Sequence, residues 1–487
     1  MEKNKAAGRR DFLKMTAAGA AGIALTSGVG KVFSKPTSGN PVSPLNKWPG
    51  RVVVNFNKSA VSSASIPKIG ADQMVVIKKM MDDSILLLTR ETTLGTDVGA
   101  AWKAVFPATL SATSKIAIKV NTLNYSTPAP HWSAVKAITD GLKLMDVHIP
   151  AANITIYDMN NGLPADNRLS QAGYTTENFP DGIGIVTDTP IDGTDGAVNN
   201  RKYASTLKNA DFLINVFGAR GHSQPPEGSQ FSMGFKSHYG TYEKINEAEF
   251  HDNLMLKVRD FACTGPVYNK QVISICVGIY GTNEGKGPDA SADLFSTYAK
   301  KIDSTAGSNP TTIIMSTDPI SAEVQGIKIL RMNKNKAYGV SDMPPYLQAA
   351  AGIETTGFSP THNLGKINEA DMDIRHILNE QIVAVKNPMA ASANMSGAMI
   401  RAHQIKGHST FINFTLSSEH VGKDALVEIF NAQGVLARSY THKVLGVRNS
   451  LSWDERDVSG SAVSSGMYVI RLSSGLVRLS SQFSIIR

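Results

Sequence analysis

Three pairs of polar residues have the side chains needed to hold a small anion and act on it. The pairs are Lys119 with Asn121, Arg220 with His222, and Lys236 with His238. Ammonium and guanidinium groups bind carboxylate and phosphate oxygens through charge-assisted hydrogen bonds, and an imidazole exchanges protons near neutral pH. In this hypothesis Lys119, Arg220 and Lys236 hold the anion, and His222 is the general acid and base. The predicted catalytic residues are therefore His222 and Lys236, and the predicted ligand-binding residues are Lys119, Asn121, Arg220 and His238.

The lysines and histidines of this set also have an interpretation that involves no function. Lysines such as Lys119 and Lys236 are commonly solvated, or extend their charge to the surface along a buried stem. His222 and His238 could be histidines of surface loops. The separation of the two histidines is longer than the short spacings typical of dedicated metal ligands, so no metal site is predicted.

The segments that must position these residues have the pattern of an α/β protein. Residues 51–386 alternate short β-rich apolar runs with amphipathic helical stretches. Strands are expected at residues 114–120, 153–158, 210–216, 272–277 and 311–315, and a helix at 133–145. The predicted fold is a doubly wound, mostly parallel sheet, in which polar residues just after the carboxyl ends of strands face a ligand crevice. Lys119 with Asn121, and the segment from Asn215 to His222, have that position.

Two acidic residues of this region have local interpretations as well. Asp318 precedes Pro319, and an Asp cap followed by Pro at the first helical position is a typical helix start, so a cap is preferred. Asp158 at a strand end either lines the crevice or begins a turn at residues 160–162, and both interpretations stay open.

Residues 117–330 resemble the family known as domain of unknown function 362. In order along the chain, the matching residues are Lys119 and Asn121; Asn215, Arg220 and His222; Lys236 and Gly240; Gly287 and Pro288; and residues 316–323. Four positions depart from the pattern: Arg220 replaces a lysine, Ser237 an asparagine, and Gly278 and Glu323 each an aspartate. The resemblance implies the α/β fold, but no activity, because none is established for the family.

A small-residue linker at 387–400 separates this region from a tail, residues 401–487, that is predicted to be a small all-β sandwich. Residues 429–434, 453–454 and 460–468 resemble immunoglobulin-like modules of the flagellar-hook-capping type and C-terminal sorting domains of the type IX secretion system. Trp453 is expected to be a buried anchor, and Tyr468 to lie at the start of a core strand. The resemblance implies sorting or attachment, with the type IX machinery as partner; an accessory β-sandwich is the alternative.

The N-terminus has the layout of an export signal. Arg9 and Arg10 precede Asp-Phe-Leu-Lys and a weakly apolar run, so residues 1–30 resemble a twin-arginine signal peptide, followed by a flexible linker at 31–50. A basic tail leading into an amphipathic helix is the alternative. The signal implies export by the twin-arginine machinery, to the periplasm or the cell surface. No later segment has 18 uninterrupted apolar residues, so no membrane span is expected in the mature chain.

The composition of the chain argues against two classes of function. The chain has 487 residues and a net charge of +8, but no blocks of Lys and Arg, which argues against nucleic-acid binding. The two cysteines, Cys263 and Cys276, are too few for a Cys-ligated iron–sulfur cluster, which needs about four thiolates. A disulfide is permitted after export, but Cys276 lies in a predicted buried strand, so buried thiols are favoured. No cofactor is identified.

Three hypotheses follow from the sequence. The first is an exported protein that binds or transforms a small anionic substrate in a crevice lined by Lys, Arg and His. The second is a non-catalytic periplasmic or cell-surface binding protein. The third is a redox or metal partner that is loaded before export. The sequence leaves open whether the protein is an enzyme.

Overall fold

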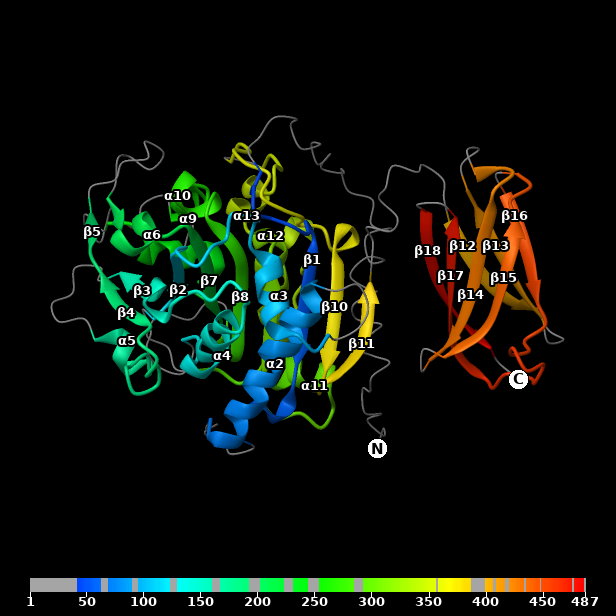
Figure 1. The fold of residues 1–487 in the computed structure, drawn as a ribbon, viewed down its shortest axis with the longest axis horizontal. Helices are drawn as coiled ribbons and strands as arrows, with labels where there is room; N and C mark the ends of the chain where they lie inside the picture. The colour runs from blue at the N-terminus through cyan, green and yellow to red at the C-terminus, as the bar shows by residue number, and fades with distance from the viewer. Residues whose placement is uncertain are drawn as a thin grey trace. The chain divides into compact units, whose positions relative to one another are not determined.

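The computed structural model divides into two compact units, Met1–Lys386 and Asn387–Arg487 (Figure 1). It describes residues 42–62, 69–89, 95–122, 129–159, 167–191, 202–222, 231–243, 254–283, 292–355, 358–386, 399–405, 409–416, 420–432, 435–446, 448–474 and 477–485. The expected signal peptide, most of the linker that follows it, and most of the linker at 387–400 lie outside these residues.

Within the described residues of the first unit, nine strands form one sheet in the order β11-β10-β1-β9-β8-β7-β2-β3-β4. The strands are β1 (Arg51–Phe56), β2 (Ile116–Val120), β3 (Ile154–Met159), β4 (Gly184–Asp188), β7 (Phe212–Arg220), β8 (Gln271–Thr282), β9 (Thr312–Ser316), β10 (Asp373–Leu378) and β11 (Gln381–Lys386). Only β9 and β11 pair antiparallel with their neighbours, so the sheet is mostly parallel, as predicted. A separate pair joins β5 (Pro190–Ile191) to β6 (Tyr203–Ala204).

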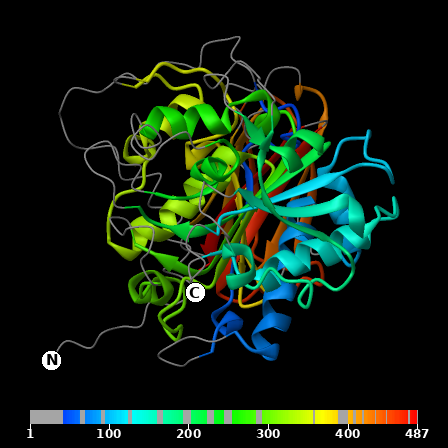
Figure 2. The ribbon, with the colours of Figure 1, turned by 90° about the vertical axis from the view of Figure 1, so that its left-hand side faces the viewer.

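Helices cover both faces of this sheet (Figure 2). One face packs against α2 (Ala71–Thr89), α3 (Val98–Val105) and α4 (Trp132–Lys143), and includes Ile118 and Ile156 of the sheet. The other face includes Ala117 and Phe217 and packs against α7 (Gly234–Ser237), α9 (Leu254–Ala262), α11 (Ser296–Ile302), α12 (Pro319–Asn333) and α13 (Pro345–Ala350). The short helices α5 (Arg168–Gln171), α6 (Ser205–Asn209) and α10 (Gly265–Tyr268) complete the unit. Because side chains alternate across a strand, Lys119 shares the α7 face with Ala117.

Two predicted strand ends were wrong. The sequence placed the end of β7 at Val216 and that of β8 at Val277, yet β7 runs to Arg220 and β8 to Thr282. The extra residues pair with one another, with Phe217 opposite Cys276 and Arg220 opposite Thr282. Arg220 is therefore held by a strand and is not a loop residue.

The second unit consists of two antiparallel sheets. One contains β12 (Met399–Ile405), β13 (Ser409–Thr415) and β16 (Arg448–Trp453); the other contains β14 (Asp424–Asn431), β15 (Leu436–Lys443), β17 (Gly466–Ser474) and β18 (Val477–Ile485). Trp453 is fully buried, as predicted, and its ring meets that of Tyr468 edge to face at 5.6 Å. This ring pair lies in the apolar core of the unit.

Candidate functional site

Lys119 forms a buried ion pair at the carboxyl end of β2. Its side chain has no exposed surface, and Nζ donates to Asp158 Oδ1 at 2.8 Å and to the Val120 carbonyl at 2.7 Å. The other Asp158 oxygen accepts from the amide and the hydroxyl of Thr122, both at 2.9 Å. Burial lowers the pKa of Lys119, and the Asp158 carboxylate opposes that effect. The pair thus joins the ends of β2 and β3, and its charges compensate each other inside the protein.

Arg220 and Asn121 meet beside this pair. Arg220 Nη1 donates to Asn121 Oδ1 at 3.2 Å, and both side chains are buried. The contact joins the last residue of β7 to the residue that follows β2. His222, two residues beyond β7, is buried as well.

Lys236 projects from α7 and differs from Lys119 in its surroundings. Its Nζ is buried and has no hydrogen-bond partner within the described residues. The Tyr239 ring lies below it, with the centroid 5.9 Å from Nζ. Burial, together with the nearby positive charge of Arg220, lowers the pKa of Lys236 well below its ordinary value. Both effects favour the neutral amine form of Lys236 over the ammonium form.

His238 begins the 3-10 turn η3 (His238–Gly240) that follows α7 and is held as a neutral ring. Its Nε2 lies 3.3 Å from Gln271 Oε1, and its Nδ1 lies 3.3 Å from Thr241 Oγ1. Because the Gln271 amide nitrogen donates to Ser274, the Gln271 oxygen accepts from His238, which places the ring proton on Nε2. Burial, with the charge of Lys119 nearby, lowers the pKa of His238 to about 3.

The segment that carries Lys236 and His238 is fixed at both ends. At its start Glu323 of α12 accepts from the Phe235 amide at 3.0 Å and from the Tyr346 hydroxyl at 2.9 Å, and burial raises the pKa of Glu323 to about 7. At its end Gly240 lies so close to the buried ion pair that a Cβ would stand 2.1 Å from Asp158 Oδ1. Only glycine permits this approach.

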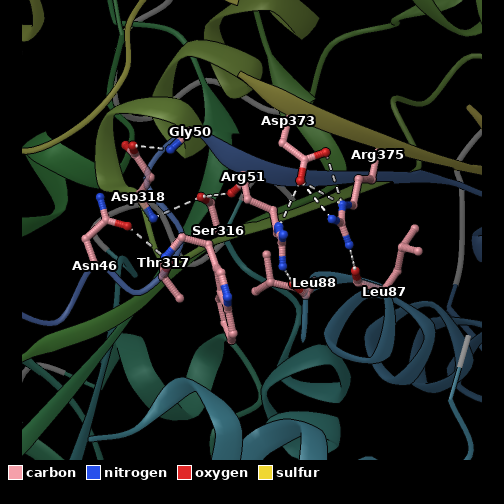
Figure 3. A network of polar contacts seen from close by, with 11 residues as sticks. Asn46, Gly50, Arg51, Leu87, Leu88, Ser316, Thr317, Asp318, Asp373 and Arg375 are labelled. Carbon is pink, nitrogen blue, oxygen red and sulfur yellow. Dashed lines mark hydrogen bonds and ion pairs between the residues drawn. The ribbon is translucent and has the colours of Figure 1, made fainter. Parts of the chain in front are cut away.

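Asp318 is the predicted helix cap and also joins distant segments (Figure 3). Its Oδ1 accepts from the Ser321 amide at 2.9 Å, which confirms the cap. Its Oδ2 accepts from the amides of Gly50 at 2.8 Å and Lys366 at 2.9 Å. Asp318, at the start of α12, thus connects this helix to the segments that precede β1 and β10.

A second buried network in Figure 3 consists of Arg51, Asp373 and Arg375, here called the buried triad. Arg51 Nε lies 2.9 Å and Arg375 Nη2 lies 2.7 Å from Asp373 Oδ2. The same guanidinium groups donate to the Leu88 and Leu87 carbonyls in the last turn of α2, at 3.2 Å and 2.7 Å. The triad attaches α2 to the β1–β10 pair, so its charges have a structural role.

Most of the predicted site residues share one neighbourhood. Asn121 contacts Arg220, the charge of Arg220 acts on Lys236, and the charge of Lys119 acts on His238. Their roles as catalytic or binding residues stay predictions. The alternative of solvated lysines and surface histidines is wrong, because Lys119, His222, Lys236 and His238 are all buried.

Sequence reasoning missed several residues of this neighbourhood. Asp158 was considered only as a crevice or turn residue, and the contacts made by Thr122, Tyr239 and Glu323 were not foreseen. The places of Lys119 and Asp158 near the carboxyl ends of two adjacent parallel strands were the signals that could have shown the ion pair.

Other potential reactive groups are accounted for in the described part of the chain. Cys263 and Cys276 are free, buried thiols, and burial raises the pKa of both. No group of three or more His, Cys, Asp or Glu side chains suited to a metal ion occurs among the described residues. Among those residues, no helix is long and apolar enough to cross a membrane.

Residues 116–328 match the family described as domain of unknown function (DUF362), which supports the resemblance found in the sequence. The match runs from β2 into α12 and contains all six predicted site residues. No curated protein matches the chain.

Among solved structures, the chain is similar to PorZ, a surface component of the type IX secretion system of Porphyromonas gingivalis, with 22% identity over 16% of this chain and 9% of PorZ, at a TM-score of 0.12. It is also similar to the sensor domain of the anti-sigma factor RsgI4 of Pseudobacteroides cellulosolvens, with 15% identity over 20% of this chain and 97% of that domain, at a TM-score of 0.15. Neither overlap bears on the function of this chain.

Proposed function

We propose that this protein is exported and that its α/β unit binds a small anionic ligand beside Arg220 and Lys236. The observation that carries the proposal is the buried Lys236 Nζ, which has no described hydrogen-bond partner and lies near a second cationic side chain. Buried polar groups without partners are uncommon in folded proteins and call for a specific explanation. A carboxylate or phosphate bound between the two side chains would supply the missing acceptor and countercharge.

The neighbouring residues have distinct roles in this proposal. Arg220, whose position is supported by Asn121, forms the charged contact with the anion. Lys119 acts through Asp158 as a positioning residue, because its ammonium is fully paired. His222 is the general acid and base if the ligand is transformed.

The β unit is proposed to be an immunoglobulin-like sorting or attachment module, and the N-terminus a twin-arginine signal. The two antiparallel sheets and the buried Trp453 support the first part. The proposed signal and the proposed sorting module together favour the periplasm or the cell surface as the destination of the protein. Replacement of Arg9 and Arg10 by lysine should retain the full chain in the cytoplasmic fraction of a host with the twin-arginine machinery. Unchanged export of this variant would contradict the proposed signal.

Ligand binding is tested on the full chain by thermal shift and calorimetry with phosphate, oxalate and pyruvate. Arg220→Gln should weaken binding about tenfold or more, because a hydrogen bond to a charged group contributes about 1.5–3 kcal/mol. Lys270→Arg is the matched control, since Lys270 donates to the Leu207, Lys208 and Ala210 carbonyls and takes no part in the site. Binding that is equal in both variants, or absent in the unmodified protein, would overturn the proposal.

Analysis of the anion after incubation with the protein distinguishes a binding protein from an enzyme. If pyruvate or another bound anion is recovered unchanged, the protein is a binding protein. If it is converted, His222→Ala should abolish conversion while binding persists. A redox or metal partner is the remaining alternative, and metal analysis of the full chain from its native host tests it.

A further inference from the structure

We infer that Lys236 is a nucleophile that forms an imine with the carbonyl group of a small oxo acid, whose carboxylate is bound by Arg220. This inference rests on the proposed function, because it names the class of the anion and adds a covalent step at the same site.

A comparison of the buried lysines carries the inference. Three lysines are buried in the described part of the chain: Lys119, Lys236 and Lys328. Lys119 pairs with Asp158 at 2.8 Å, and Lys328 pairs with Glu369 at 2.7 Å. Lys236 alone among the three has an Nζ without a hydrogen-bond partner. Its Nζ is therefore not engaged by another described group.

The surroundings of Lys236 suit a nucleophile better than a permanent cation. A lysine that only binds anions as a cation gains from a nearby carboxylate, which keeps it protonated. Lys236 instead has a guanidinium nearby and the Tyr239 ring below it. Desolvation and a neighbouring cation are the two means by which proteins keep a lysine amine unprotonated and reactive.

An oxo acid would make two contacts in the proposed site. The carboxylate would pair with Arg220, which brings the adjacent carbonyl carbon toward Nζ. The amine adds to that carbon to give a carbinolamine. Loss of water then gives the imine: both amine protons and the carbonyl oxygen leave in that water, and no oxidant or reductant takes part.

The inference is tested by reductive trapping on the full chain, with pyruvate and glyoxylate as probes and sodium borohydride as reductant. Intact mass measurement should show one reduced adduct per chain, and peptide mapping should place it on Lys236. Lactate has the same carboxylate but no ketone, so it should give no adduct. Acetaldehyde has the carbonyl but no carboxylate, so it should require about tenfold higher concentration or more, given the contribution of a charged hydrogen bond.

Two variants separate this inference from the proposed function. Lys236→Arg keeps a cation but removes the nucleophile, so it should give no adduct while pyruvate still raises the melting temperature. Lys270→Arg should trap pyruvate like the unmodified protein. Pyruvate binding without an adduct on Lys236, or an adduct spread over many lysines, would overturn the imine alone. If neither phosphate nor pyruvate binds, the proposed anion site falls, and the imine with it.

Discussion

Replacement of Lys236 by methionine should make the unliganded protein more stable. Methionine has a similar length and flexibility but no polar atom, so it removes a buried amine that has no described hydrogen-bond partner. A buried polar group without a partner costs about 1–3 kcal/mol. The free energy of unfolding of Lys236→Met should therefore rise by about that amount, while the response to anions is lost. Residues that are kept at the expense of stability are typical of functional sites.

Replacement of two other lysines by methionine should instead lower the free energy of unfolding. Lys119→Met leaves Asp158 as an uncompensated buried charge, which should cost about 3–5 kcal/mol. Lys270→Met leaves three carbonyls without their shared donor and should also destabilise. Urea unfolding followed by tryptophan fluorescence measures all three variants. If Lys236→Met destabilises the protein as Lys119→Met does, Lys236 has a structural partner and the reasoning about the site is wrong.

Three further predictions concern the residues that hold the site in place. Gly240→Ala should destabilise the protein by about 1–3 kcal/mol through overpacking, because the added Cβ would stand 2.1 Å from Asp158 Oδ1. Gly307→Ala is the control: a Cβ at this position would have no atom within 4 Å, so the urea midpoint should change little. Glu323 has a folded-state pKa of about 7, above its ordinary 4.5, so the folded protein holds an extra proton between these values. Stability should then fall as the pH rises from 4.5 to 7, by on the order of 3 kcal/mol, and Glu323→Gln should abolish this dependence in unfolding measured at pH 5 and pH 8. Asp373→Ala removes the carboxylate that both buried arginines of the triad share and should cost about 3–5 kcal/mol. The loss should be seen as a lower melting temperature, and a change below about 1 kcal/mol would contradict the structural role of the triad.

The apolar runs of the sequence predicted the centres of several strands, because residues buried on both faces of a sheet must be apolar. They did not predict the ends of β7 and β8. Gly218, Gly278 and Gly281 interrupt both runs and resemble loop residues, yet the two segments extend each other by pairing. The place of β1 between β9 and β10 has no local signal either, because its partners are far away along the chain.

For the candidate site too, the sequence indicated the types of residue but not the contacts between them. The sequence selected six polar residues from their types and their order along the chain, and their roles stay predictions. It did not distinguish Lys119 from Lys236, because the difference lies in Asp158 on another strand. Whether a lysine is paired or unpaired depends on contacts between distant segments.

The pairing of β1 has a consequence for the order in which the protein folds during synthesis. Arg51 lies opposite Asp373, and Val53 opposite both Arg375 and Met315. The strands β2, β3, β4, β7 and β8 can assemble once residue 282 has left the ribosome, since each pairs with at least one other strand among them. β1 finds its partner strands only after β9 and β10 leave the ribosome. Pairing at such long sequence separation is slow, so a chain stopped before β9 would contain five of the nine strands of the sheet but no partner strand for β1.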